Sequence, residues 1–414
     1  MADTKPGVPQ LRFPEFEGEW PERRLGQFLE FKNGVNADKS MYGRGHKFIN
    51  VMDIVSDQPI TSENIIGSVS IPDSEFKKNE VLCGDLLFQR SSETREEVGQ
   101  SSIYVDAEKS ATFGGFVIRG RPISDMEPMH FHWMLKTARV RKDMTSRSGG
   151  STRYNVGQDA LAAVVVYPAP TLPEQKKIAA FLGAVEAKLN GLQRKRNLLT
   201  GYKRGVMQRL FSGVLRFKRD DGSAFPDWEE MRLGEVLSEH GLKSTGLEPV
   251  FSVSVQKGLV DQIEHLGRSF SAKETDHYNR VLPSDIVYTK SPTGEFPLGI
   301  VKQSKLSSEV IVSPLYGVFE PETKWLGVML DAYFASNINT TNYLKPIVQK
   351  GAKNTINVTN TGFLSGTLPL PIDHGEQRKI ADFLSALDAK IDAVASQITQ
   401  TEAFKKGLLQ QMFV

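Results

Sequence analysis

The sequence predicts an α+β protein in which one structural unit occurs twice, each copy being a globular domain followed by a long helix. Two observations predict this. The segments that begin at Glu174-Gln175 and at Glu376-Gln377 repeat each other without a gap at an offset of 202 residues (376 minus 174). The sequence between them mixes strand-like and helix-like stretches, and the two copies of it differ. Self-similarity at a fixed offset indicates a repeated structural unit.

The repeat divides the chain into four parts. A chain of 414 residues is also too long to form one ordinary hydrophobic core, so more than one domain is expected. Shorter matches support the division: Trp20 with Trp228, Asp85 with Asp285, and Gly99 with Gly299. The predicted parts are a first globular domain (1–172), a central helix (173–213), a second globular domain (214–373) and a distal helix (374–414).

Strands and helices are expected in both globular domains, which gives the α+β class. Short runs rich in β-branched and aromatic residues predict the strands. In the first domain these are residues 46–55, 84–90, 113–120 and 160–168, and in the second 248–255, 284–290 and 309–321. Apolar residues at helical spacing predict helices at 126–144 and 324–336.

Both long helices are expected to begin in the same way. Thr171 and Asp373 each precede a glutamate by three positions, which predicts a capping box at Glu174 and Glu376. A proline-rich stretch before each helix predicts the exit from a sheet, because proline cannot continue a strand ladder.

The apolar residues of both long helices alternate at steps of four and three, which is coiled-coil spacing. Two amphipathic core helices would be the alternative, but the duplicated register favours an antiparallel coiled coil with a pseudo-twofold axis. The spacing runs over about 33 residues, or about 50 Å at 1.5 Å per residue. Arg196, Lys203, Thr401 and Lys405 interrupt it. The predicted seam residues are Ile178, Leu182, Val185, Leu189 and Leu192 in the central helix and Ile380, Leu384, Leu387, Ile391 and Val394 in the distal helix.

Charge distinguishes the two helices. Residues 173–213 hold nine Lys or Arg and two Asp or Glu, whereas residues 374–414 hold five of each. The cluster Arg194-Lys195-Arg196 lies near the centre of the first helix. It faces either DNA or an acidic surface of a partner, and the sequence leaves both open.

Catalytic motifs are missing from the sequence, so a binding protein is expected rather than an enzyme. There is no phosphate-binding glycine loop, dinucleotide fingerprint or serine elbow. His130 and His132 lack zinc spacing and are expected to pack in or beside a helix. Asp73 is too close to Glu75-Phe76-Lys77 for a nuclease motif. The sequence predicts no catalytic residue, cofactor or metal on this chain.

The compartment is predicted from what the sequence lacks. A single cysteine, Cys83, fits a reducing cytoplasm. No apolar run is long enough for a membrane span, so no membrane partner is expected.

Two basic segments upstream of the helices predict contacts with phosphate groups. Residues 136–155 carry six Lys or Arg against one acid, and residues 332–372 carry no acid at all. Cations, small hydroxyl groups and glycines suit a DNA backbone, although an ordinary solvated surface is the alternative. The residues after the matched strands, in the loops 90–100 and 290–299, are candidates for base reading, with plain surface as the alternative there too. The DNA-binding candidates are Arg90, Ser91, Arg95, Arg147, Arg153, Asn155, Lys290, Ser291, Lys350, Lys353 and Asn357.

The residues so far described resemble one known family. The duplicated "EQKKIAAFLGAVEAKL" and "EQRKIADFLSALDAKI", the opening "LRFPEFEGEWPERRLGQFLEFKNG", its echo "FPDWEEMRLGEVL" and the two aspartate motifs resemble DNA specificity subunits of type I restriction–modification systems. The resemblance covers the whole chain.

The resemblance implies a function without catalysis. Each globular domain would be a target-recognition domain that reads one half of a bipartite, asymmetric sequence in double-stranded DNA. The helices would set the half-site spacing and dock two modification subunits. Those subunits would bring S-adenosylmethionine and adenine methylation, and translocating restriction subunits can join them to give an endonuclease.

Two other functions are considered. One is the specificity chain of a related system in which a single partner chain both methylates and cleaves; co-purification distinguishes it by showing one partner or two. The other is a symmetric protein-binding scaffold with no DNA role, which a salt-sensitive gel shift on duplex DNA would exclude.

Overall fold

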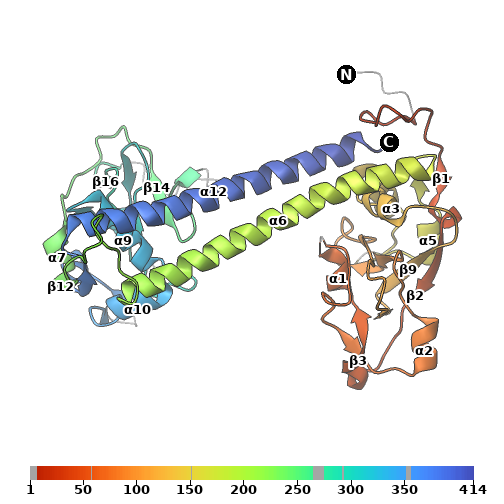
Figure 1. Cartoon of the computed structure of the whole chain (residues 1–414), viewed down its shortest axis with the longest axis horizontal. Coiled ribbons are helices and arrows are strands. Elements are labelled where there is room, and N and C mark those ends of the chain that lie inside the picture. The colour runs from red at the N-terminus through yellow and green to blue at the C-terminus, as the bar shows by residue number, and fades with distance from the viewer. Residues whose placement is uncertain (1–6, 57, 151, 264–274, 291–292, 351–355) are drawn as a thin grey trace. The chain divides into compact units, whose positions relative to one another are not determined.

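In each half of the protein, strands and short helices surround the start of one long helix and the end of the other. The computed structural model describes residues 7–56, 58–150, 152–263, 275–290, 293–350 and 356–414. The chain forms two compact units: unit 1 comprises residues 1–193 and 396–414, and unit 2 comprises residues 194–395 (Figure 1). Each unit therefore contains one globular domain and one part of each long helix.

The two long helices are α6 (Leu172–Phe211) and α12 (His374–Gln411). In unit 1 the start of α6 packs against the end of α12, with Leu182 in the same buried cluster as Leu408 and Met412. In unit 2 the pairing is reversed, and Leu210 near the end of α6 shares a cluster with Ile380 at the start of α12. The helices are therefore antiparallel within each unit, as predicted.

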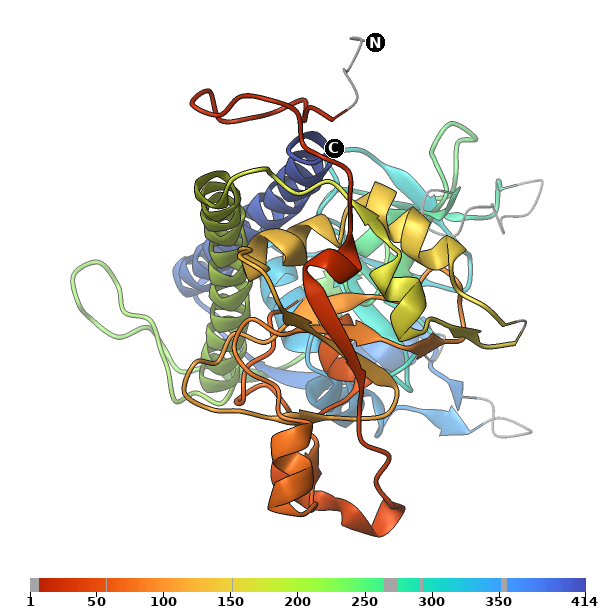
Figure 2. The ribbon, with the colours of Figure 1, turned by 90° about the vertical axis from the view of Figure 1, so that its right-hand side faces the viewer.

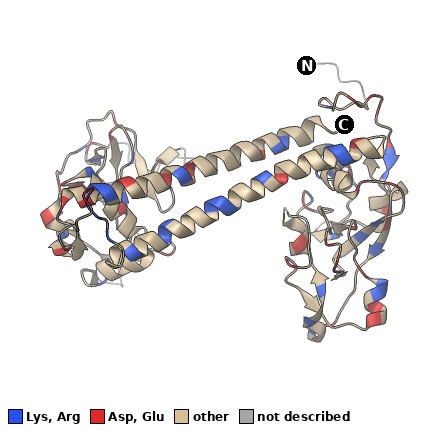
Figure 3. Cartoon of the chain, in the orientation of Figure 1, with Lys and Arg blue, Asp and Glu red and all other residues tan. Residues whose placement is uncertain are grey.

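Most of the predicted seam residues are buried. Eight of the ten are at most 9% exposed, and Leu192 and Ile391 are half-buried. Two of the four polar interruptions form ion pairs: Lys203 pairs with Asp388, and Lys405 lies 2.7 Å from Glu186. Figure 3 shows Lys and Arg recurring along α6.

Unit 1 is built on a four-stranded antiparallel sheet in the order β2-β9-β5-β7, beside a smaller three-stranded sheet β4-β3-β8. Apolar residues from the four-stranded sheet, α3, α4 and the ends of both long helices form one core. β3 and α2 lie side by side at one end of the unit, where His46 stacks on Phe76 with ring centroids 4.0 Å apart (Figures 1 and 2). The strands are β1 (Arg23–Arg24), β2 (Leu29–Asn33), β3 (Tyr42–Ile49), β4 (Ser68–Val69), β5 (Leu86–Gln89), β6 (Ser91–Ser92), β7 (Ser101–Ile103), β8 (Thr112–Phe113), β9 (Val117–Pro122), β10 (Tyr154–Asn155) and β11 (Val165–Val166). The helices are α1 (Val51–Val55), α2 (Asp73–Lys78), α3 (Pro128–Met134), α4 (Ala138–Ser146) and α5 (Gln158–Ala162), with single 3-10 turns at Leu25–Gln27 and Lys39–Met41.

Unit 2 repeats this plan with a four-stranded sheet in the order β13-β20-β17-β18. Its core contains Tyr288, Phe319 and Phe363, whose rings stack with centroids 4.8 and 5.1 Å apart. The strands are β12 (Glu229–Arg232), β13 (Leu237–Ser238), β14 (Phe251–Ser254), β15 (Gly258–Asp261), β16 (Asn279–Val281), β17 (Ile286–Thr289), β18 (Ile300–Gln303), β19 (Val310–Val312), β20 (Gly317–Pro321), β21 (Gln349–Lys350), β22 (Ile356–Asn357) and β23 (Thr367–Leu370). The helices are α7 (Leu233–Val236), α9 (Lys324–Phe334), α10 (Asn337–Leu344) and α11 (Asn360–Ser365).

The α+β class is confirmed, but five predicted elements are wrong in part. The runs 113–120 and 309–321, each expected to be one strand, are each divided between two strands by a turn. Residues 46–55 were expected to form one strand, but β3 ends at Ile49 and residues 51–55 form α1. The helix begins there because Asn50 and Asp53 form a capping box. Residues 158–162 form α5 before the short strand β11. The helix expected at 126–144 is two helices, and the Thr137 hydroxyl donates to the carbonyl of Met134 at the break.

His130 and His132 lie on α3 and are fully buried, as expected of packing residues. His130 Nε2 accepts a hydrogen bond from the backbone N–H of Ala169 at 3.3 Å. Burial lowers the pKa of His130 to about 3 and that of His132 well below its usual value. Among the described helices, none is both long and apolar enough to cross a membrane.

Candidate nucleic-acid interface

The same aspartate turn starts the central strand of both sheets. Asp85 Oδ2 accepts a hydrogen bond from the N–H of Leu82 at 2.8 Å, and Asp285 Oδ2 accepts one from Leu282 at 2.7 Å. An aspartate that bonds its own local backbone fixes a turn. The matched aspartates therefore fix where β5 and β17 begin, and thus where the loops at the far ends of these strands emerge.

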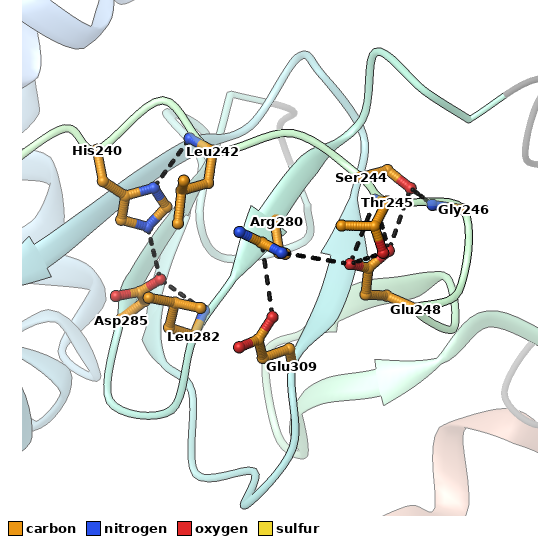
Figure 4. A network of polar contacts seen from close by, with 10 residues as sticks. All are labelled: His240, Leu242, Ser244, Thr245, Gly246, Glu248, Arg280, Leu282, Asp285 and Glu309. Atoms are coloured by element: carbon orange, nitrogen blue, oxygen red, sulfur yellow. Dashed lines mark hydrogen bonds and ion pairs between the residues drawn. The ribbon is translucent and has the colours of Figure 1, made fainter.

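The two aspartates have different charged partners. Asp85 forms a bidentate pair with Arg121, with N–O distances of 3.0 and 2.7 Å. Asp285 is bonded to His240 Nε2 at 2.9 Å (Figure 4). His240 Nδ1 accepts from the Leu242 N–H, so Nε2 carries the ring proton and donates to Asp285. Burial raises the pKa of Asp285.

A second polar cluster fixes the loop that precedes β14 in unit 2. Glu248 accepts hydrogen bonds from Thr245 and Ser244, and lies 3.7 Å from Arg280, which also faces Glu309 at 3.5 Å (Figure 4). Burial acts to raise the pKa of Glu248, but the hydrogen bonds from Thr245 and Ser244 outweigh it and lower the pKa to about 2. A carboxylate held in this way stays ionised.

The ends of two distant segments meet beyond β5 in unit 1. The strand β6 pairs with β10 in antiparallel register, which places Ser91 opposite Asn155. The Ser91 hydroxyl donates to Asn155 Oδ1. The preceding Arg90 is half-buried, and its guanidinium donates to the carbonyl of Gly115 at 3.3 Å. The structure thus brings together three candidates that lie up to 65 residues apart (155 minus 90).

The loop that follows is held by arginines on and near α4. Arg141 donates to the carbonyls of Glu96 and Val98 at 2.8 and 2.7 Å, and burial lowers its pKa to about 10. Arg95 Nε donates to the carbonyl of Thr145 at 3.2 Å, although the side chain is exposed. The sequence placed Arg141 among the six cations of the segment 136–155 that was expected to contact phosphate, whereas in the structure it supports the candidate base-reading loop.

The cations of the basic segment in unit 1 have unequal freedom. Arg147 forms a bidentate pair with Asp143, both distances being 3.0 Å. Arg153 is exposed and forms no ion pair within the described residues. Arg153 is therefore the freer of these two candidate phosphate ligands. The assignment of both to phosphate stays a prediction.

The second domain carries its candidates at corresponding places. Lys290 directly follows β17, and burial lowers its pKa while Glu239 opposes this. The strands β21 and β22 pair with Gln349 opposite Asn357, as Gly149 lies opposite Asn155 in unit 1. In the same register Lys350 lies opposite Ile356. Ser291 and Lys353 lie outside the described residues.

Both globular domains are joined to the long helices through the same pair of side chains, here called the clamp. Arg12 forms a bidentate pair with Glu174 at 2.7 and 2.9 Å, and Arg216 forms one with Glu376 at 2.8 and 2.9 Å. The capping-box prediction is therefore wrong in its second half. The cap side chain Thr171 does accept from the Glu174 N–H at 3.4 Å, but the glutamate carboxylates are taken by the arginines, which offer a stronger charge-assisted bond.

The adjacent glutamines complete the clamp. Gln175 Nε2 donates to the carbonyl of Ala169 at 2.8 Å, and Gln377 Nε2 donates to that of Pro371 at 2.9 Å. The sequence held a signal for the clamp, because Leu11-Arg12-Phe13 recurs as Leu215-Arg216-Phe217. Phe13 packs edge-on against Phe181 at 5.8 Å, just as Phe217 packs against Phe383 at 5.7 Å.

Comparisons with known proteins agree with this duplication. The family described as "Type I restriction modification DNA specificity domain" matches residues 17–200 and again residues 226–402. Two curated relatives come from Methanocaldococcus jannaschii: the provisionally named type I restriction enzyme MjaX specificity subunit and the MjaVIII specificity subunit. The first is 24% identical over 95% of this chain and 93% of its own length, and the second 26% over 96% and 92%. The crystal structure of the type I restriction–modification S subunit from M. genitalium superposes with a TM-score of 0.62 at 13% identity, over 98% of this chain and 99% of that one. This structural likeness concerns the fold.

Proposed function

This chain belongs to the type I restriction–modification DNA specificity family, and from that premise we propose that it is the DNA-recognition subunit of such a system. Each globular domain reads one half of a bipartite, asymmetric site in double-stranded DNA. The observation that carries the proposal is the duplicated clamp, Arg12–Glu174 and Arg216–Glu376, which holds two different recognition domains on matched helices. Two globular domains with different loops, each held on its helix by the same clamp, suit one complex that reads two different half-sites.

Recognition is assigned to the loops beyond β5 and β17. In unit 1 the Ser91–Asn155 pair of the short β6–β10 ribbon, with Arg90 and Arg95 beside it in the chain, offers hydroxyl, amide and guanidinium groups. Such groups read base edges in the major groove. Arg153 offers an exposed cation for phosphate, which positions the protein without reading sequence.

Catalysis is assigned to other polypeptides. The sequence holds no loop for a nucleotide or methyl donor, so S-adenosylmethionine binds on modification subunits that dock on the long helices. Two copies of the seam, each with its lysine–acid bridge, suit two identical partners. Restriction subunits join when DNA is cleaved.

The test is reconstitution followed by sequencing of methylated DNA. The full chain with the modification subunits encoded beside it should methylate adenine in a bipartite, asymmetric site, and the chain alone should methylate nothing. Replacing Ser91 and Asn155 together by alanine should change or relax one half-site. The matched control, alanine at the exposed Lys109, should leave both unchanged. Methylation by the chain alone, or a loss of both half-sites in the double variant with its fold intact, would contradict the proposal.

A further inference from the structure

A cleft in unit 2 has no role in the function described so far. It has a volume of about 500 Å³ and lies between α9, the end of β18 and the first turns of α12. Lys324, Trp325 and Arg378 line it, together with Ser304. A volume of this size is that of a site for a small ligand or a few side chains.

One polar group in the cleft lacks a partner. Ser304 is 3% exposed, and among the described residues its Oγ has no hydrogen-bond partner. A buried hydroxyl costs free energy unless it is bonded, so an unpaired one that lines a cleft points to an acceptor supplied from outside.

The charges around the cleft suit one carboxylate rather than a chain of phosphates. Lys305 is already compensated by Asp331 at 3.2 Å and Asp388 at 3.7 Å. Arg378 lies 3.6 Å from Asp382, but both side chains are about two-thirds exposed, so this pair is weak.

Lys324 carries the uncompensated charge of the cleft. It forms no ion pair among the described residues, and its ammonium lies 5.8 Å from the centroid of the Trp325 ring, as does the guanidinium of Arg378. The nearby aspartates would repel a polyanion more strongly than they repel a single carboxylate.

The position of the cleft also separates it from the candidate DNA loop. β17 and β18 form a hairpin in which Ile286 is opposite Gln303 and Thr289 opposite Ile300. The loop 290–299 closes one end of this hairpin. Ser304 lies at the other end, where its carbonyl accepts from the Ser284 N–H at 3.0 Å.

Unit 1 lacks the lysine, the tryptophan and the serine of the cleft, although Lys176 matches Arg378 at the offset of 202 residues. The N-cap residues of α3 and α9 bind the matched glutamines, Glu127 through its N–H to Gln175 and Thr323 through its hydroxyl to Gln377. The two caps therefore correspond, which aligns Lys324 and Trp325 with Pro128 and Met129. Tyr104 takes the place of Ser304, since each donates its N–H to the matched aspartate's carbonyl, at 2.9 and 2.7 Å. The feature belongs to one half of a duplicated protein.

We propose that this cleft binds an aspartate or glutamate side chain of a protein partner, and that the chain takes one such partner on this side only. The carboxylate accepts from Ser304 and faces Lys324 and Arg378, while the adjoining peptide packs on Trp325. This inference does not depend on which DNA sequence is read.

The test is a photo-crosslink in the assembled complex with duplex DNA. p-Benzoylphenylalanine replaces Trp325, and the matched control carries it at Met129. Position 325 should crosslink to one peptide that contains Asp or Glu, in a ratio of one per chain, and position 129 should not crosslink to that peptide. The variants Lys324→Gln and Arg378→Gln should lower the yield at least fivefold and leave DNA binding unchanged.

Three results would overturn the proposal: a crosslink to DNA, a crosslink at position 129 to the same peptide, or a yield indifferent to both charge variants. Ser304→Ala gives an independent readout, since it should weaken the partner while the thermal unfolding temperature stays within a few degrees of the parent. Partner retention unchanged by Ser304→Ala would show that the hydroxyl is not a ligand.

Discussion

Lys405 on α12 lies 2.7 Å from Glu186 on α6, and the same bridge recurs in the other unit between Lys203 and Asp388. Both lysines, at matched positions 202 apart, interrupt the apolar seam. The Lys405–Glu186 bridge is the more buried, with side chains 14% and 7% exposed against 21% and 33% for the other. A duplicated cation in a seam is thus matched by a duplicated acid on the facing helix.

Glu186→Gln should destabilise unit 1 by about 3 kcal/mol, because it leaves Lys405 charged and unpaired in a buried seam. Asp388→Asn is the matched control and should cost about 1 kcal/mol or less, since water screens its partner. The double variant Glu186→Leu with Lys405→Met should recover most of the loss. Urea unfolding measures all three. Equal costs at Glu186 and Asp388 would show that burial does not set the strength of these bridges.

Glu248→Gln should reduce the loss of stability in acid. Hydrogen bonds lower the pKa of Glu248 from 4.5 to about 2. As the pH falls, the unfolded chain therefore takes up this proton first, so the contribution of Glu248 is complete above pH 4.5 and is lost as the pH falls towards 2. The variant should show a flatter decline of unfolding free energy over this range. Thr245→Val removes the hydroxyl donor alone, so its decline should lie between those of the parent and Glu248→Gln.

Neutralising Arg147 and Arg153 together should flatten the dependence of log K on log salt by about two units, at about 0.9 per phosphate contact. Lys350 with Lys353 is the matching pair in the second domain. The single variants refine this, because Arg153 is unpaired among the described residues while Arg147 is held by Asp143. Arg153→Ala alone should flatten the salt dependence of log K by about 0.9, the value for one phosphate contact, and should do so equally for every DNA sequence. An unaltered affinity and salt slope in the double variant would mark these cations as plain surface charge.

Inserting one heptad after Leu192 and one after Ile398 should lengthen both helices by about 10 Å. The two bridges set this choice of sites, because they place residue 192 opposite the region just after 398. At about 3.4 Å per base pair, the preferred half-site separation should grow by about three base pairs. Methylation mapping of the matched insertion measures it. The single insertion after Leu192 is the control and should disrupt assembly. An unchanged half-site spacing in the variant with both insertions would show that the helix length does not set the spacing.

The long helices could be predicted from the sequence because the 3.5-residue period of their apolar residues can be seen within each helical segment alone. The seam at Ile178, Leu182 and Ile380 needed no knowledge of the domains. The errors arose where local side chains decide the backbone: Asn50 and Asp53 cap a helix inside an apolar run that was expected to be a strand. A capping interaction of two side chains with the backbone is a weaker sequence signal than a periodic pattern, although it determines the backbone conformation in the folded protein.

The candidate site was predictable in its position but not in its pairing. The basic segment and the loop after β5 could be found from composition, whereas the contact of Ser91 with Asn155 depends on two strands 64 residues apart. The clamp was missed for another reason. Its arginines lie near the start of each globular domain, far in sequence from the glutamates that they bind, and only the repeated Leu-Arg-Phe would have linked Arg12 with Arg216.

The Leu11 N–H donates to the carbonyl of Gln411 at 2.8 Å, so the earliest described part of the chain is bonded to the last helix. Unit 2 occupies a continuous stretch, but unit 1 must wait for residues 396–414. At about 5–20 residues per second, synthesis of the roughly 200 intervening residues takes about 10–40 seconds. During that time the apolar stripe at Ile178, Leu182 and Val185 lacks Leu408 and Met412 to cover it. The first half made on the ribosome is thus the last to be completed, and nascent chains that end before residue 396 should depend on chaperones far more than the finished protein does.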